Sequence, residues 1–225
     1  MLTAVSRYGA RVAPDTEQIV ADCKARGELI QGPHIARFEA AFARRAGVPP
    51  AQAIAASYGR MAFYYILKAL NLPAGAEIIV PALTFWVIPE LARVAGLKVA
   101  FADVDPATFS IDPAALEGAI TPDTRAIVPT HLYGLPCDMD AVMRIATRHN
   151  LRVIEDCAHA LGATYDGRPV GTLGDAGFFS FQTLKPLNCY GGAWPSSRIP
   201  RSRRASGRWP SASRGPIANA SRTGC

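Results

Sequence analysis

The stretch Leu151-Arg-Val-Ile-Glu-Asp156 has the pattern of a buried strand that ends in two carboxylates, and Cys157-Ala-His-Ala-Leu-Gly162 follows it directly. A short apolar run of this kind is typical of a central strand in a parallel sheet that helices cover on both faces. Other short apolar runs alternate with helical periodicity between positions 15 and 186. We therefore expect an α/β fold, with three α/β/α layers and a mostly parallel central sheet.

The same pattern gives the residue ranges of the expected elements. Strands are expected at 53–56, 77–80, 98–102, 126–129, 151–155 and 176–181. Helices are expected from Asp15 to Gly27, around Phe38 and Phe42, and over 60–70, 86–95, 113–119 and 138–149.

The net charge of +6 is concentrated in the last 33 residues, which hold seven Arg and no Lys, Asp or Glu. The rest of the chain has 17 basic and 18 acidic residues and is nearly neutral. We therefore expect no nucleic-acid partner for the globular part. The longest apolar stretch, Ile78 to Pro89, is too short to cross a bilayer, and no secretory signal is visible, so we expect a cytoplasmic protein without membrane contact. The five scattered cysteines predict reduced thiols and no metal site.

Residues 193–225 lack Leu, Val, Phe and Tyr and are rich in Arg, Ser and Pro, so we expect them to be disordered. The tail has two explanations, a natural basic tail or a change of reading frame. Loss of one G from codons for GGGMAVVEDP yields GGAWPSSRIP, the sequence of residues 191–200. The expected organisation is an N-terminal segment (1–30), a large domain (31–192) and the tail (193–225).

Asp156 lies at the carboxyl end of its strand, where ligands of open α/β sheets collect. It could equally serve as a helix N-cap. A second apolar strand, Phe178-Phe-Ser-Phe-Gln-Thr-Leu-Lys185, runs into a lysine. A lone lysine is more often a solvated charge. A lysine beside a carboxylate and a hydroxyl that binds phosphate is what a cofactor held as a Schiff base needs.

Taken together, these stretches resemble the DegT/StrS branch of the fold-type-I aminotransferases. The resemblance rests on six ordered segments and the YGG after them: 27–43 (GELIQGPHIARFEAAFA), 59–63 (GRMAF), 77–105, 120–142, 153–185 (VIEDCAHALGATYDGRPVGTLGDAGFFSFQTLK) and 190–192. It implies the large domain of a fold-type-I transferase that uses pyridoxal 5'-phosphate.

The resemblance also implies catalytic roles for three residues. Lys185 would bind the cofactor covalently and move the proton between substrate carbon and cofactor. Asp156 would keep the pyridine nitrogen protonated, so that the ring accepts electrons. His159 would lie near the phenolic oxygen or the ring face, and the alternative is a histidine satisfied in the core.

The cofactor phosphate is expected at the turn that begins at Ser57 and opens a helix, where free amides favour an anion. Gly59, Arg60 and Met61 form this turn, and Ser180 is the second phosphate candidate. Many relatives have a small hydroxyl residue in place of Arg60, which could replace that contact or point into solvent.

The resemblance also suggests roles for Phe85, Gly191 and Gly192, and His131 is a candidate because it follows a predicted strand. Phe85 is the expected ring-stacking aromatic, with Trp86 beside it, and either could instead pack in the core. His131 could line the substrate pocket. Gly191 and Gly192 would carry the chain past the site.

The implied function is transfer of an amino group from a glutamate-like donor to a nucleotide-linked keto-sugar or a similar carbonyl acceptor, in a likewise implied homodimer. A related dehydrating branch has His in place of the lysine, so Lys185 argues against it. Because nothing after Gly192 resembles the C-terminal domain of relatives, we expect a truncated protein. The alternatives are a fragment that binds the cofactor without turnover and a nucleic-acid-binding protein that uses its tail.

Overall fold

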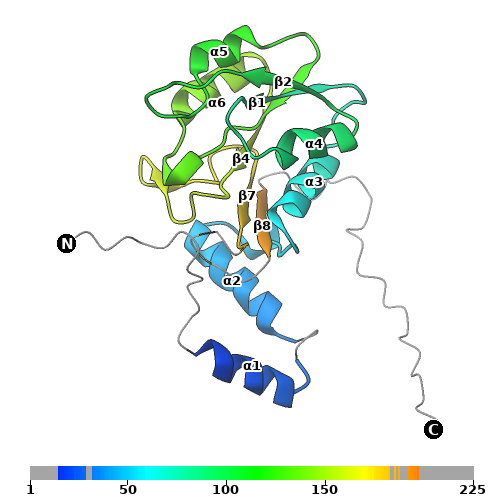
Figure 1. Cartoon of the computed structure of the whole chain (residues 1–225), viewed down its shortest axis with the longest axis vertical. Coiled ribbons are helices and arrows are strands. Elements are labelled where there is room, and N and C mark those ends of the chain that lie inside the picture. Colours follow the sequence, from blue (N-terminus) through cyan, green and yellow to red (C-terminus); the bar gives the residue numbers. More distant parts are fainter. Residues whose placement is uncertain (1–14, 29–31, 183–184, 186, 188–191, 198–225) are drawn as a thin grey trace.

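The computed structural model describes residues 15–28, 32–182, 185, 187 and 192–197. Its centre is a six-stranded sheet with the order β2-β1-β3-β4-β7-β8 (Figure 1). The first five strands are parallel, and β8 pairs antiparallel with β7. The strands are β1 (Glu77–Pro81), β2 (Lys98–Ala102), β3 (Thr124–Ile127), β4 (Arg152–Asp156), β7 (Ala176–Ser180) and β8 (Ala193–Ser197). The expected α/β fold with a mostly parallel sheet is confirmed.

Helices precede or connect these strands. They are α1 (Thr16–Ala25), α2 (His34–Ala46), α3 (Gly59–Leu70), α4 (Val87–Val94), α5 (Pro113–Gly118) and α6 (Met139–Arg148). Short 3-10 turns, η1 (Pro50–Gln52) and η2 (Leu132–Gly134), and a hairpin of β5 (Thr164–Tyr165) and β6 (Arg168–Pro169) complete the described part. Within that part, none of the helices combines the length and the apolar character needed to span a membrane.

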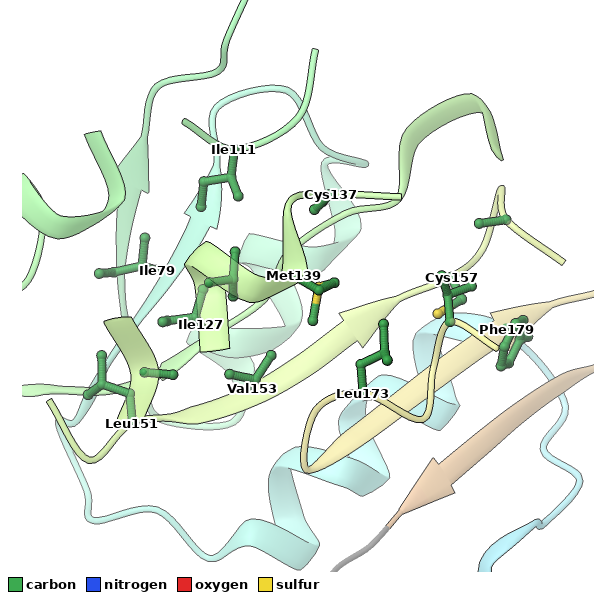
Figure 2. Packing of buried hydrophobic residues seen from close by; sticks show 14 of the residues in the cluster. Ile79, Ile111, Ile127, Cys137, Met139, Leu151, Val153, Cys157, Leu173 and Phe179 are labelled. Atoms are coloured by element: carbon green, nitrogen blue, oxygen red, sulfur yellow. The ribbon is translucent and has the colours of Figure 1, made fainter. Parts of the chain in front are cut away.

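Both faces of the sheet are buried, because successive residues of each strand point to opposite sides. Ile79, Ile127 and Val153 contribute to one apolar cluster (Figure 2). The same cluster also includes residues of α2 and α6. The adjacent strand residues Ile78 and Ile154 contribute to a second cluster with residues of α3 and α4. This two-sided burial explains why the strands are continuous apolar runs.

The predicted strand at 53–56 is wrong. Residues 50–52 form η1, and the following segment makes isolated bridges, Ala56 with Ala193 and Tyr58 with Gly192. The segment therefore lies beside β8 but does not extend into a ladder.

The prediction that disorder begins directly after Gly192 is also wrong. Residues 193–197 form β8, which pairs along its whole length with β7. Ala193 also exchanges backbone hydrogen bonds of 2.8 and 2.9 Å with Ala56. Backbone pairing on both sides therefore orders a segment whose composition predicted no structure. Residues 198–225 lie outside the described part, so the expectation that they are disordered stays a prediction.

Candidate active site

A cavity of about 660 Å³ opens at the carboxyl ends of the parallel strands. Asp156 enters it from the end of β4, Ser180 from the end of β7 and Gly59 from the first turn of α3. This is the edge at which ligands of open α/β sheets bind. The cavity is lined by Tyr58, Gly59, Arg60, Leu83, Thr84, Phe85, Ile88, Thr130, Leu132, Tyr133, Asp156, Ala158, His159, Phe178, Ser180, Gln182 and Lys185.

Asp156 and Lys185 are ionisable residues of opposite charge that line this cavity. The Asp156 side chain is buried, and its Oδ1 accepts a hydrogen bond of 3.0 Å from the Ala158 backbone N–H. Burial raises the pKa of the Asp156 carboxyl to about 6, although the Ala158 amide and the Lys185 charge act in the opposite direction. Burial lowers the pKa of the half-buried Lys185 amine, and the Asp156 charge opposes this. A lysine with a lowered pKa is more often the neutral nucleophile.

The first turn of α3 packs directly against the end of β7. A Cβ atom placed on Gly59 would lie 3.1 Å from the Ser180 Cβ and 3.4 Å from its Oγ. The backbone N–H groups of Gly59 and Arg60 belong to the first turn of α3, where amides have no acceptor within the helix. The absent side chain, the two amides and the Ser180 hydroxyl thus form a small cradle suited to an anion.

The Arg60 side chain was expected either to contact the phosphate or to point into solvent. It is exposed to solvent and also lines the cavity. Its guanidinium lies over the ring of Tyr58, 4.2 Å from the ring centroid, and both residues line the cavity. This cation–π contact holds the charge at the rim, although the side chain is exposed. Met61 is half-buried and is absent from the lining, so its expected cofactor contact finds no support in the cavity.

The aromatic candidates are exposed rather than packed in the core. Phe85 lines the cavity with 56% of its surface accessible, whereas Trp86 is 69% accessible and is not part of the lining. His159 lines the cavity and is half-buried, and its ring stacks on that of Tyr133. Core packing is therefore the wrong alternative for Phe85 and Trp86.

His131 does not line the cavity, so the expectation that it faces the substrate is wrong. It is fully buried, and its Nδ1 accepts a hydrogen bond of 3.1 Å from the Cys137 backbone N–H. The proton is therefore on Nε2, which donates to Glu155 Oε2 at 3.0 Å. Because Glu155 and Asp156 are adjacent in β4, their side chains point to opposite faces of the sheet.

The Glu155 carboxylate is a buried anchor that the sequence reasoning overlooked. Besides His131, it accepts three backbone hydrogen bonds of 2.7 Å from the turn before β7, from the N–H groups of Gly171, Leu173 and Gly174. Glu155 thus ties the segment after β3 and the turn before β7 to the strand that carries Asp156. The Glu-Asp pair at the strand end was the available signal, because only one of two adjacent carboxylates can face the cavity.

The cysteines of the described part, Cys23, Cys137 and Cys157, are buried free thiols. Cys157 lies beside His131 and Glu155, a trio whose ligand atoms are close enough to hold a metal ion. Burial raises the pKa of the Cys157 thiol to about 12, and the Glu155 oxygens are already used by four donors. This chemistry disfavours a metal at the trio. Cys189 and Cys225, like Gly191 of the expected glycine turn, lie outside the described residues, whereas Gly192 is described and has a positive φ of 97°.

Sequence reasoning also missed several lining residues. Thr84 and Thr130 join two walls of the cavity through a contact of 3.2 Å between their hydroxyls. Gln182 and Tyr133 add polar groups to the lining. Each follows the carboxyl end of a strand, and that position was the available signal.

Comparisons with known proteins agree with this geometry. The chain is 47% identical over 150 residues to the GDP-perosamine synthase of Caulobacter vibrioides, which covers 67% of this chain and 40% of that protein. It is 44% identical over 153 residues to the UDP-N-acetyl-3-dehydro-alpha-D-glucosamine 3-aminotransferase of Acidithiobacillus ferrooxidans, covering 68% and 41%. The chain spans half or less of the length of these curated relatives.

Among solved structures, the aminotransferase TlmJ from Streptoalloteichus hindustanus superposes with a TM-score of 0.84 at 28% identity. The match covers 89% of this chain and 55% of that one. Residues 11–193 match the DegT/DnrJ/EryC1/StrS aminotransferase family. The chain therefore belongs to the DegT/DnrJ/EryC1/StrS aminotransferase family.

Proposed function

We propose that the protein is a pyridoxal 5'-phosphate-dependent aminotransferase that moves an amino group from a glutamate-like donor to a nucleotide-linked keto-sugar. The observation that carries the proposal is that Asp156, Lys185 and the cradle beside Ser180 line one cavity. Relatives named for GDP-linked and UDP-linked sugars support the acceptor class.

The lining residues fit the shape and charge of this cofactor. The amides of Gly59 and Arg60 and the Ser180 hydroxyl would hold its phosphate, because a helix N-terminus without a side chain in the way accepts an anion. Asp156 would hold a proton on the ring nitrogen, and Phe85 would cover a ring face. When bound, the cofactor supplies an electron sink for negative charge that develops on the substrate carbon.

The chain's own groups would do the remaining work. Lys185 Nζ would be the point of covalent attachment, and after its release it would take and return the proton at the substrate carbon. Its lowered pKa favours both roles because the neutral amine is the nucleophile and the base. His159 would lie near the phenolic oxygen or the ring face of the cofactor, and its own ring stacks on that of Tyr133. Arg60 would add a positive charge at the rim for the phosphate.

The test is attachment of the cofactor at one lysine. The protein is incubated with pyridoxal 5'-phosphate and reduced with borohydride, and the labelled peptide is identified by mass spectrometry. We expect label at Lys185, loss of that label in Lys185→Ala, and retention in Lys68→Ala, which removes an exposed lysine of α3. Label spread evenly over exposed lysines would refute the assignment of the site.

Turnover separates the enzyme from the second candidate, a fragment that holds the cofactor without reacting. The observation that favours this candidate is that the chain covers only 40% to 50% of the first curated relatives. Glutamate is added to the loaded protein and 2-oxoglutarate is measured. Release of 2-oxoglutarate that disappears in Lys185→Ala supports the aminotransferase, and attachment without release supports the fragment.

We further infer a homodimer in the cytoplasm. Trp86, Val94 and Phe101 are large apolar residues that are 49% to 71% exposed and lie outside the cavity lining, which suits a surface covered by a second copy. Sedimentation of the wild-type protein and of Trp86→Ser tests the dimer. A monomer at micromolar concentration in both cases would contradict it.

A further inference from the structure

Tyr133 stands out among the side chains that line the cavity. It is 79% exposed, more than any other large hydrophobic residue in the described part of the chain. Its backbone has φ 53° and ψ 23°, the left-handed region that residues with a Cβ atom usually avoid. A costly backbone conformation that holds an aromatic ring out of the core, at the rim of a cavity, suggests a role in binding.

The strain at Tyr133 differs from that at most comparable positions. Asn71, Asn150 and Asp166 also have positive φ, but their short polar side chains tolerate this region. The remaining case is Phe109, which is 52% exposed and does not line the cavity. Tyr133 is therefore the aromatic residue whose strained conformation coincides with the candidate site.

Contacts with neighbours fix the direction of the ring. The Tyr133 ring is stacked on the His159 ring, with centroids 5.8 Å apart and planes 16° from parallel. Gly134, with φ 88°, lets the chain turn back directly after it. With one face toward His159 and most of its surface accessible, the ring presents its other face to a ligand.

We propose that Tyr133, backed by His159, is a platform on which the pyranose ring of the acceptor lies, so that Tyr133 helps to select a sugar over a small keto acid. This inference rests on the proposed function. One face of a pyranose is a layer of C–H groups, which packs on an aromatic ring, while its edge carries hydroxyls. Gln182 and Thr84 line the same cavity and offer hydrogen bonds to such an edge.

The sugar, rather than the nucleobase, is the part expected on this platform. The reacting carbonyl belongs to the sugar and must reach the cavity that Lys185 lines. Two phosphates separate the base from that ring, so the base lies farther from Lys185. The platform and Lys185 belong to one cavity, which favours the sugar ring as occupant.

The experiment uses UDP-N-acetylglucosamine as an unreactive probe, with uridine diphosphate alone for comparison. Saturation-transfer NMR identifies the probe protons that contact the full chain, and a titration gives the dissociation constant. We expect contacts at the pyranose protons and a rise of about two- to tenfold in the dissociation constant for Tyr133→Asn, as for loss of one aromatic contact. Tyr133→Phe keeps the ring and should bind as the wild type does.

Phe109→Asn is the matched control, because it also replaces an exposed aromatic residue at positive φ with one that tolerates that region. It should leave probe binding unchanged. The proposal is overturned if Tyr133→Asn binds the probe as the wild type does, if both Asn variants weaken it equally, or if only uridine protons are saturated. It is also overturned if Tyr133→Asn changes the sedimentation of the protein instead, since the ring would then cover a subunit contact. Cofactor attachment at Lys185 is measured separately, so failure of the proposed function would be recognised independently.

Discussion

Replacing the Glu155 carboxylate by an amide should destabilise the protein strongly although it changes the size of the side chain very little. Oε1 accepts hydrogen bonds from the N–H groups of Leu173 and Gly174, and Oε2 accepts hydrogen bonds from Gly171 N–H and His131 Nε2–H. In Glu155→Gln, the NH2 group must replace one of these oxygens. In either orientation, two buried donors then face another donor.

Each orphaned buried donor costs about 1–3 kcal/mol. Relief from burying a charge offsets part of this loss, so we expect about 2–4 kcal/mol less stability, a large share of the roughly 5–15 kcal/mol typical of a domain. Urea unfolding followed by circular dichroism measures the change. The matched control is Glu117→Gln, which breaks exposed ion pairs with Arg148 and His149 and should change the stability little. Equal stabilities of the two variants would refute the anchoring role of Glu155.

Three further predictions concern the cavity. The pKa of Asp156 is raised from 3.8 to about 6, so its stabilising contribution is present below about pH 4 and lost as the pH rises through 6. Asp156→Asn should therefore stabilise the cofactor-free protein by up to about 3 kcal/mol at pH 8 but not at pH 4, as measured by urea unfolding, and equal gains at both pH values would contradict this. Gly59→Ala should weaken binding of pyridoxal 5'-phosphate but not of pyridoxal, since its methyl group would lie 3.1 Å from the Ser180 Cβ. Gly118→Ala, with no heavy atom within 4 Å of its methyl group, is the control, and equal affinities of the two variants would argue against the cradle. Because burial lowers the pKa of Lys185, its modification by a small amine-reactive reagent should remain fast at a lower pH than the modification of exposed lysines. If the modification rates of Lys185 and of the exposed lysines fell together as the pH was lowered, the lowered pKa of Lys185 would be contradicted.

The sequence predicted the central strands well because their burial on both faces leaves a local signal. In β4 the run from Val153 to Ile154 is apolar and is followed by carboxylates, which marks both the strand and the edge at which it ends. The cavity followed from the same logic, since the carboxyl ends of parallel strands converge. For this reason the sequence could predict that Asp156, Ser180 and Lys185 lie near one another, and the three residues do line one cavity.

The errors arose where distant backbone partners decide the outcome. Ala56 makes a bridge instead of a strand because its partner, Ala193, lies more than a hundred residues away. β8 forms despite its composition because its backbone pairs with β7. His131 was expected at the cavity because it follows a predicted strand. Its actual partner, Glu155, is set by strand register and leaves no signal in the local sequence. The strain at Tyr133 was equally invisible, since no motif encodes its positive φ.

The pairing of Ala56 with Ala193 has a consequence for synthesis on the ribosome. The segment leading into α3 emerges early, but its partner strand emerges only after nearly the whole described chain has been translated. The Gly59 cradle can therefore close only late, when β8 inserts between β7 and residue 56. Until then the nascent chain exposes an open strand edge, and chaperones that recognise such edges should bind it at this stage.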